Sequence, residues 1–130
     1  MSDLTSRNKV LVRRIYEEMW NQSNSDLAAE IFVHPEGVEN FLRQFLPSFS
    51  DLQHTIDDMI AEADQVATRF TAPGIHSGPW MSFPATGRSI HYTGVTWVRI
   101  ANGKIIEHET WWDKTGLIDQ VTGWLVPLEN

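Results

Sequence analysis

Apolar residues in the first part of the chain recur every three to four positions, which is the spacing of amphipathic helices. The polar run at positions 21–24 interrupts this pattern, so we expect the first helix to end there. Its predicted apolar stripe consists of Leu4, Leu11, Val12, Ile15, Tyr16 and Met19.

Two shorter helices are predicted next. Ser25 stands where an N-cap is expected, ahead of a short apolar segment, and the pair His34-Pro35 ends that segment because the residue before proline disfavours the helical conformation. A third helix begins at Pro35-Glu36 and ends before Pro47. Its apolar face carries Val38, Phe41, Leu42 and Phe45.

From about residue 52 the period changes to the alternation of strands. The first strand is expected to turn Ile56 and Ile60 to the same face, and Asn102-Gly103 is a strong signal for a tight hairpin. Asp113 is expected to begin a last short helix. The predicted strands cover 53–60, 65–72, 88–100 and 104–112. Helices on one face of an antiparallel meander define an α+β fold.

Both faces of the last two predicted strands carry apolar side chains. Ile90, Tyr92 and Val98 alternate with Val95 and Trp97, so the two sets lie on opposite faces. With the helices covering one face, the other face needs a partner.

The returning strand has the same two-sided pattern. Ile106 and Trp112 are predicted on one face of this strand, and Ile105 and Trp111 on the other. Each tryptophan can bury roughly 150–250 Å². A symmetric dimer hides such a patch with one self-complementary surface. We therefore predict a homodimer through the outer sheet face, with Val95, Trp97 and Trp111 at or near its interface.

Composition and charge narrow the classes of partner. The chain has 130 residues, 42% of them hydrophobic, and a net charge of −7. This length fits a single domain, residues 1–130, and the acidity predicts no binding to nucleic acid or to an anionic membrane surface. Cysteine is absent from the sequence, which excludes disulfides and thiolate metal sites. The opening MSDLTSRNK has no apolar signal region, so we expect a cytoplasmic protein with no membrane segment.

Three segments resemble the SnoaL-like polyketide cyclases and their ester-cyclase relatives, which have the nuclear-transport-factor-2-like fold. They are NKVLVRRIYEEMWNQSNSD, GIHSGPWMSFPATGRSIHYTGV and VRIANGKIIEHETWWDKTGLIDQV. The resemblance implies a cone in which a curved antiparallel sheet wraps the N-terminal helix and leaves an apolar cavity. It also implies aldol-type ring closure without metal or organic cofactor, by a carboxylate and a histidine.

The chain departs from the family pattern in three places. Thr110 stands where the family has its carboxylate, and Thr96 where it has the partner histidine. A hydroxyl is not a general base near neutral pH without a base of its own. The segment around His34-Pro35 is also shorter than the family usually has, so the pocket is either more open or closed by a dimer partner.

His108 is the strongest remaining acid/base candidate, because strand alternation puts it on the same face as Thr110 and Trp112. The competing interpretation is a partly buried histidine bonded to a carbonyl or a hydroxyl. Asp113 is the second catalytic candidate, although its place before a helix predicts an N-cap that bonds the amide of Gly116 or Thr115.

The expected binding residues are aromatic, apolar or hydroxyl-bearing. They are Tyr16, Trp20, Phe41, Phe45, Trp80, Met81, Phe83, Tyr92, Thr96, Thr110 and Trp112. The histidines show no chelating spacing, so we expect no metal site. Three functions stay open: a cofactor-free cyclase acting on a small apolar carbonyl compound, a non-catalytic module that binds a hydrophobic ligand, and a hydrolase or isomerase with a relocated base such as Asp58 or Asp113.

Overall fold

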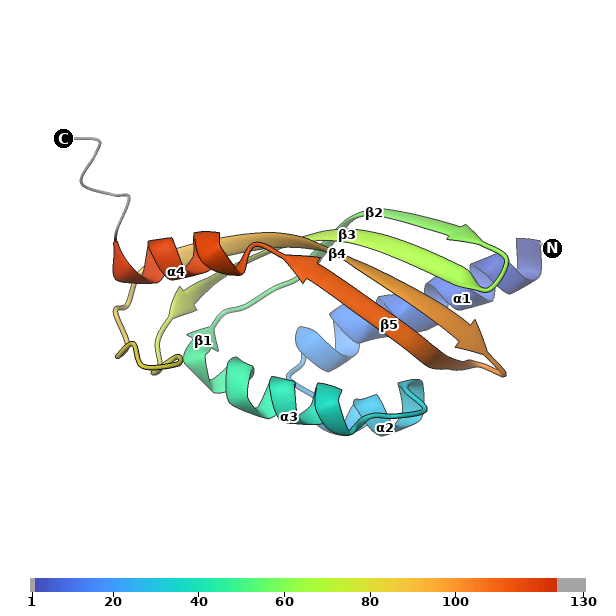
Figure 1. The fold of residues 1–130 in the computed structure, drawn as a ribbon, viewed down its shortest axis with the longest axis horizontal. Helices are drawn as coiled ribbons and strands as arrows, with labels where there is room; N and C mark the ends of the chain where they lie inside the picture. Colours follow the sequence, from blue (N-terminus) through green and yellow to red (C-terminus); the bar gives the residue numbers. More distant parts are fainter. Residues whose placement is uncertain (1, 124–130) are drawn as a thin grey trace.

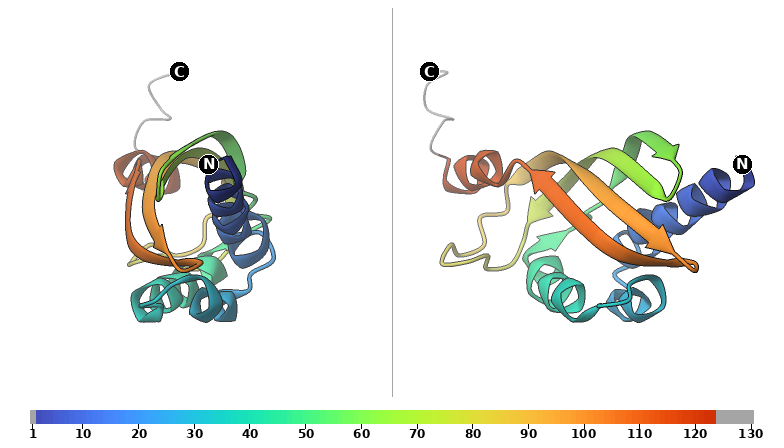
Figure 2. Two further views of the ribbon diagram at one scale, coloured as in Figure 1. Left: turned by 90° about the vertical axis from the view of Figure 1, so that its right-hand side faces the viewer. Right: turned by 45° about the vertical axis from the view of Figure 1, so that its right-hand side comes forward.

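The computed structural model describes residues 2–123 and shows an α+β arrangement of helices against a curved antiparallel sheet (Figures 1 and 2). Helix α1 (Ser2–Arg14) continues directly into π-helical turns, Ile15–Trp20. Val12 and Tyr16 on this helix are almost fully buried against the sheet. The predicted first helix and its apolar stripe are therefore present, although Leu4 at its start is exposed.

Two further helices close the side opposite the sheet (Figure 2). A 3₁₀ turn, Ser25–Leu27, leads into α2 (Ala28–Ile31), and α3 (Glu36–Phe45) runs into a second 3₁₀ turn, Leu46–Ser48. The prediction that Ser25 is an N-cap is wrong. The 3₁₀ turn starts one residue earlier than expected, so Asn24 occupies the cap position, and it makes no side-chain capping bond.

The sheet has five strands, all paired antiparallel. β1 (Phe49–Ser50) and β2 (Thr55–Glu62) pair with the same long strand, β3 (Gln65–His76), which then pairs with β4 (Ser89–Ala101), and β4 with β5 (Lys104–Trp112). At the turn between β4 and β5, Asn102 and Gly103 both have positive φ, of 53° and 76°. The predicted hairpin is confirmed.

β3 extends four residues beyond its predicted end at residue 72, through Pro73. The Pro73 carbonyl accepts a hydrogen bond from the Gln53 amide on the side where β1 and β2 lie. Residue 73 lies between the part of β3 that pairs with β1 and the part that pairs with β2. It needs no ladder bond from its nitrogen on that side, so proline is tolerated in the strand.

The predicted faces are wrong in two places, and a β-bulge is the cause in each. The bulge between Ile56 and Asp58 exposes Ile60, which is 67% accessible, and turns Met59 toward the core instead. The second bulge lies opposite Arg99–Ile100 and leaves Ile105 buried and Ile106 exposed, the reverse of the prediction. A bulge inserts one residue and so inverts the alternation on one side of it.

Helix α4 (Lys114–Thr122) lies along the part of β4 that β5 leaves unpaired (Figure 1). The Gln120 side chain accepts a hydrogen bond from the His91 amide and donates one to the His91 carbonyl, both at 2.8 Å. This helix therefore covers a sheet edge and does not join the others in the concavity. Within residues 2–123, no helix is long and apolar enough to cross a membrane.

Candidate functional site

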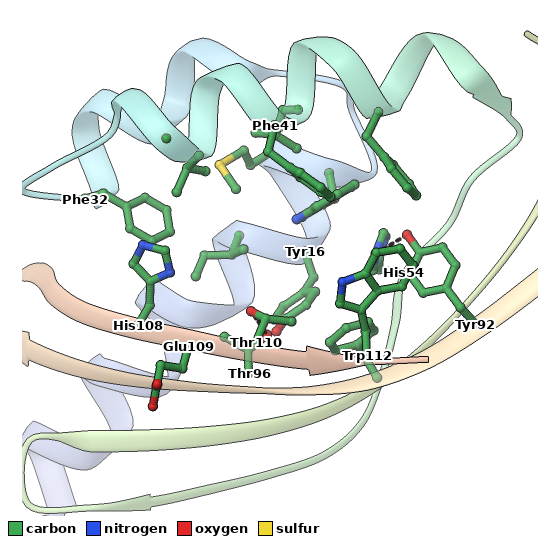
Figure 3. A pocket seen from close by; sticks show the side chains of 18 residues that line it. Tyr16, Phe32, Phe41, His54, Tyr92, Thr96, His108, Glu109, Thr110 and Trp112 are labelled. Atoms are coloured by element: carbon green, nitrogen blue, oxygen red, sulfur yellow. Dashed lines mark hydrogen bonds between the residues drawn. The ribbon is translucent and has the colours of Figure 1, made fainter. Parts of the chain in front are cut away.

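A pocket of about 360 Å³ lies between the inner face of β3–β5 and the helices (Figure 3). Its volume is within the range of small-molecule sites. Most of its lining is aliphatic or aromatic. The lining residues are Ile15, Tyr16, Met19, Trp20, Phe32, Gly37, Val38, Phe41, Leu42, Phe45, His54, Phe70, Tyr92, Thr96, His108, Glu109, Thr110 and Trp112.

Aromatic rings form one wall of the pocket. Phe41 stacks on Phe45 with centroids 5.3 Å apart, and Trp20 meets both rings edge-on. Phe45 also contacts Tyr92 and Trp112 from the sheet, each at a centroid distance of 5.9 Å. Helix α3 and the inner sheet face thus enclose a largely aromatic space.

Three hydroxyl groups lie at the middle of the pocket. Thr96 and Thr110 face each other across β4 and β5, with their hydroxyl oxygens 3.0 Å apart. Burial raises the pKa of Tyr16 to about 12, and the nearby Thr96 hydroxyl opposes that shift. The Tyr16 hydroxyl has no hydrogen-bond partner within the described part of the chain. All three groups are neutral at physiological pH.

His108 lies at one end of the pocket, on the same face of β5 as Thr110. Its ring packs edge-on against Phe32, with centroids 5.0 Å apart. Partial burial lowers the pKa of His108 below its ordinary value. The imidazole is therefore the free base near neutral pH and can accept a proton.

His54 lies at the other end, and sequence reasoning missed it (Figure 3). The Asn21 side chain accepts a hydrogen bond from the His54 amide at 2.6 Å and donates one to its carbonyl at 3.0 Å. The Tyr92 hydroxyl lies 3.0 Å from Nε2 of the imidazole. Burial lowers the pKa of His54 to about 3, so it too is neutral. The sequence offered one indication: His54 is two residues before the inward-facing Ile56, so strand alternation puts both side chains on the same face.

Four predicted site residues lie outside this pocket. The Asp113 carboxylate accepts a hydrogen bond from the Gly116 amide at 2.8 Å, as the capping interpretation predicted. Trp80 is buried against Phe49, and Phe83 packs on Trp80. Met81 is 60% exposed. The Gly/Pro loop therefore folds over the core beyond the pocket, and the other predicted binding residues and His108 all line it.

The short connection between α2 and α3 is attached to β5, since the Val33 amide donates to the Ile105 carbonyl. A second hollow, of about 530 Å³, lies beside it and shares Phe32, His108 and Glu109 with the pocket. Among residues 2–123, no cluster of three or more histidine, aspartate or glutamate side chains is arranged to hold a metal ion.

The family model for SnoaL-like polyketide cyclases matches residues 10–121. Several solved structures have the same fold. A SnoaL-like protein from Jannaschia sp. CCS1 aligns with a TM-score of 0.84 at 19% identity, over 92% of this chain and 94% of that one. TsrD from Streptomyces laurentii aligns with a TM-score of 0.81 at 22% identity, over 89% and 95%.

IdmH from Streptomyces antibioticus aligns with a TM-score of 0.78 at 24% identity, over 88% of this chain and 98% of that one. At these identities the likenesses show the fold alone. No protein with a curated description matches the chain.

Proposed function

Because the chain belongs to the SnoaL-like polyketide cyclase family, we propose that it catalyses cofactor-free proton transfer on an apolar carbonyl compound held in the pocket. The reaction class is an aldol-type ring closure or a related enolisation. The observation that carries the proposal is a neutral imidazole, His108, on the same strand face as a cluster of neutral hydroxyls.

The first step breaks a C–H bond next to the substrate carbonyl. The proton goes to the His108 imidazole, and the electron pair of the broken bond becomes an enolate whose charge lies on the carbonyl oxygen. Hydroxyl donors of the central cluster stabilise that oxygen by hydrogen bonds. Tyr16 lines the same part of the pocket, and its hydroxyl is close to that of Thr96.

In ring closure, the enolate carbon then attacks a second carbonyl of the same molecule. The new carbon–carbon bond takes the electron pair, the attacked oxygen becomes an alkoxide, and the His108 imidazolium returns its proton to that alkoxide. Thr96 and Thr110 orient the substrate by hydrogen bonds and carry no proton. Neither Asp58 nor Asp113 lines the pocket, so a base relocated to either has no support from the geometry.

A non-catalytic binding module is the second candidate. It is favoured by one observation, which is that the two threonines at the family's acid and base positions hydrogen-bond to each other. Such a pair satisfies itself and leaves an apolar pocket with a few orienting donors, which is sufficient for ligand binding.

Hydrogen–deuterium exchange separates the two functions. 2-Tetralone, a flat ketone with acidic C–H bonds, is incubated with the protein in D₂O, and loss of the α-proton signal is followed by NMR. The proposal predicts exchange well above the buffer rate. Binding seen by quenching of the pocket tryptophans, with exchange at the buffer rate, would instead identify a binding module.

A further inference from the structure

The pocket is open to solvent between helix α3 and the edge strand β5. Its lining residues on β4, Tyr92 and Thr96, are buried. On β5, by contrast, His108 and Thr110 are exposed, and on α3 the Phe41 side chain is 46% exposed. A ligand therefore enters, and any part of it that is too long for the pocket leaves, through the slot between α3 and β5.

Helix α3 crosses the pocket from the His108 end to the opposite end (Figure 3). Shortly before the helix begins, the Phe32 ring packs against His108, with centroids 5.0 Å apart. At the last residue of the helix, the Phe45 ring meets Tyr92 at 5.9 Å. Gly37, the second residue of α3, therefore lies at the His108 end of the slot.

Gly37 lines the pocket and has no side chain to narrow it. It precedes Phe41 by four residues and Phe45 by eight, so it lies on the same helix face as these two lining residues. A Cβ added to Gly37 would have no neighbour within 4 Å apart from its adjacent residues and its own helix backbone. Packing within the described chain therefore does not require glycine at this position.

The backbone does not require glycine there either. Gly37 is helical and is absent from the glycines with positive φ. Glycine makes a helix less stable than alanine does, because it loses more conformational freedom on folding. The remaining reason for a glycine is that another molecule approaches the backbone closely. At the rim of a pocket, that molecule is the ligand.

We propose that Gly37 is a specificity-determining residue, which leaves room for an arm of the substrate that extends through the slot and lies against the α3 backbone. This rests on the proposed function, in which the carbon that loses its proton faces His108. The arm at the His108 end is then the one attached to that carbon. The exposed Phe41 ring, one turn further along α3, offers it apolar surface. The substrate class is an apolar carbonyl compound with an aryl or alkyl arm on its reacting carbon.

The test compares two regioisomers, 1-benzyl-2-tetralone and 6-benzyl-2-tetralone, which have the same composition and differ only in where the arm is attached. The arm at position 1 is next to the carbonyl and points into the slot, whereas the arm at position 6 points away from it. Dissociation constants are measured by calorimetry. The wild type should bind the 1-benzyl isomer about tenfold more tightly. A wild type without this preference would overturn the proposal.

The variant Gly37→Leu fills the slot with a side chain that suits a helix. It should bind the two regioisomers within about twofold of each other. Asn40 offers a matched control, since it is exposed on the same helix and does not line the pocket. Asn40→Leu should keep the wild-type preference. A folded Gly37→Leu variant that keeps the preference, or an Asn40→Leu variant that loses it, would count against Gly37.

A measurement on the wild type covers the case in which Gly37→Leu does not fold. In the saturated complex with 1-benzyl-2-tetralone, the benzyl ring protons should show nuclear Overhauser contacts to the α-protons of Gly37. The 6-benzyl isomer should show none from its benzyl ring. Absence of the contacts with the first isomer, or equal contacts with both, would contradict the proposal.

These outcomes are separate from those for catalysis. A regioisomer preference that depends on Gly37, together with exchange of 2-tetralone at the buffer rate, would remove the proposed enzyme activity and leave the role of Gly37 standing. Exchange of 2-tetralone without any Gly37-dependent preference would do the reverse.

Discussion

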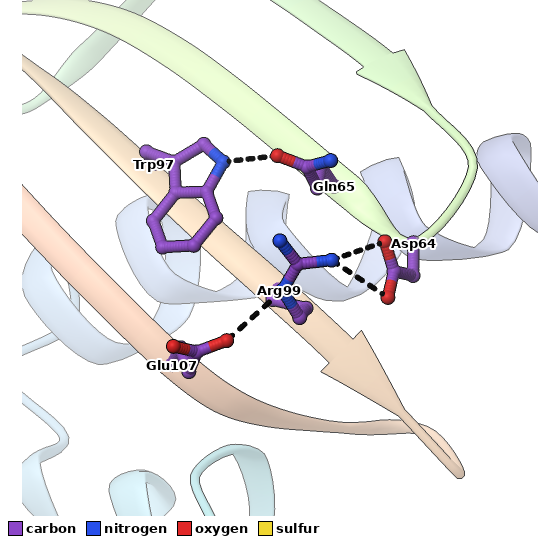
Figure 4. Close-up of polar contacts among 5 residues, drawn as sticks. All are labelled: Asp64, Gln65, Trp97, Arg99 and Glu107. Atoms are coloured by element: carbon purple, nitrogen blue, oxygen red, sulfur yellow. Dashed lines mark hydrogen bonds and ion pairs between the residues drawn. The ribbon is translucent and has the colours of Figure 1, made fainter.

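The two faces of the β4–β5 hairpin carry different kinds of polar group. On the inner face, Thr96, Thr110 and His108 are neutral and surround the pocket. On the outer face the groups are charged and paired (Figure 4). Arg99 bonds the Asp64 carboxylate at 3.0 and 3.1 Å and the Glu107 carboxylate at 2.9 Å.

Polar side chains on the outer face also cover part of the Trp97 ring. The Arg99 guanidinium lies 5.5 Å from the centre of the Trp97 ring, and the indole N–H donates to Gln65 at 2.8 Å. Trp97, Arg99 and Glu107 thus find partners within the protein on the outer face, whereas the inner face places neutral groups around the pocket. A single strand serves both purposes because its side chains alternate.

The largest expected effect is a loss of folding stability at low pH, caused by the buried His54 on the inner side. Its pKa is lowered in the folded protein, so the unfolded chain binds more protons between pH 6.5 and about 3, and stability falls as pH falls through that range. We expect His54 to account for a loss of roughly 3–4 kcal/mol in the free energy of unfolding by pH 4. Urea melts of wild type and H54F/Y92F at pH 7 and pH 4 measure it. Equal losses in both proteins would contradict the assignment.

The next effect tests the chemistry of the inner face directly. His108→Asn should lower deuterium exchange by on the order of a hundredfold, about 2.7 kcal/mol in activation free energy, because it removes the proton acceptor. Its neighbour Glu107 faces outward, so Glu107→Gln is the matched control and should leave exchange unchanged. Melting temperatures check that both variants are folded. Equal exchange rates in the two variants would end the candidacy of His108.

The outer face is tested by measuring whether the protein forms a dimer. Trp111 is 57% exposed and Val95 38%, whereas Trp97 is partly covered. We predict a homodimer through this surface, in which Trp111→Glu weakens association by roughly 2 kcal/mol or more. Trp97→Glu should weaken it as well and also lower stability. Val10→Glu, at an exposed position on α1, is the control. Sedimentation at micromolar concentration measures the mass, and a wild-type species of 14.9 kDa would refute the dimer.

The smallest effect concerns Asp113, which caps α4 outside the pocket. Asp113→Ala should cost about 1 kcal/mol of stability, while Asp113→Asn should be mild because asparagine also caps. Chemical denaturation measures both. If Asp113→Asn kept full stability but abolished exchange, the carboxylate would have a chemical role that capping does not explain.

Sequence alternation predicted the faces of residues 107–112 because the β4–β5 register is regular there. It failed at Ile105 and Ile106, and at Met59 and Ile60, because bulges depend on strand pairing that the sequence pattern does not encode. The hairpin and the Asp113 cap were predictable because each is set by a few adjacent residues.

His54 was not predictable in the same way. It lies in an irregular segment before β2, and its place depends on Asn21, which is 33 residues away in sequence. The apolar loop residues Trp80 and Phe83 were expected at the pocket for their size. They pack beyond it because the loop turns back on itself through two hydrogen bonds between their backbones.

A crystal structure with bound 6-hydroxy-2-tetralone tests most directly whether the inner face is the reactive one. We predict density in the pocket, with the ketone oxygen within hydrogen-bond distance of the Tyr16, Thr96 or Thr110 hydroxyl. The adjacent carbon should face the His108 imidazole. A ligand bound instead in the outer hollow beside Trp97 and Glu107, or with its ketone away from every pocket hydroxyl, would contradict the assignment of the inner face as the site of proton transfer.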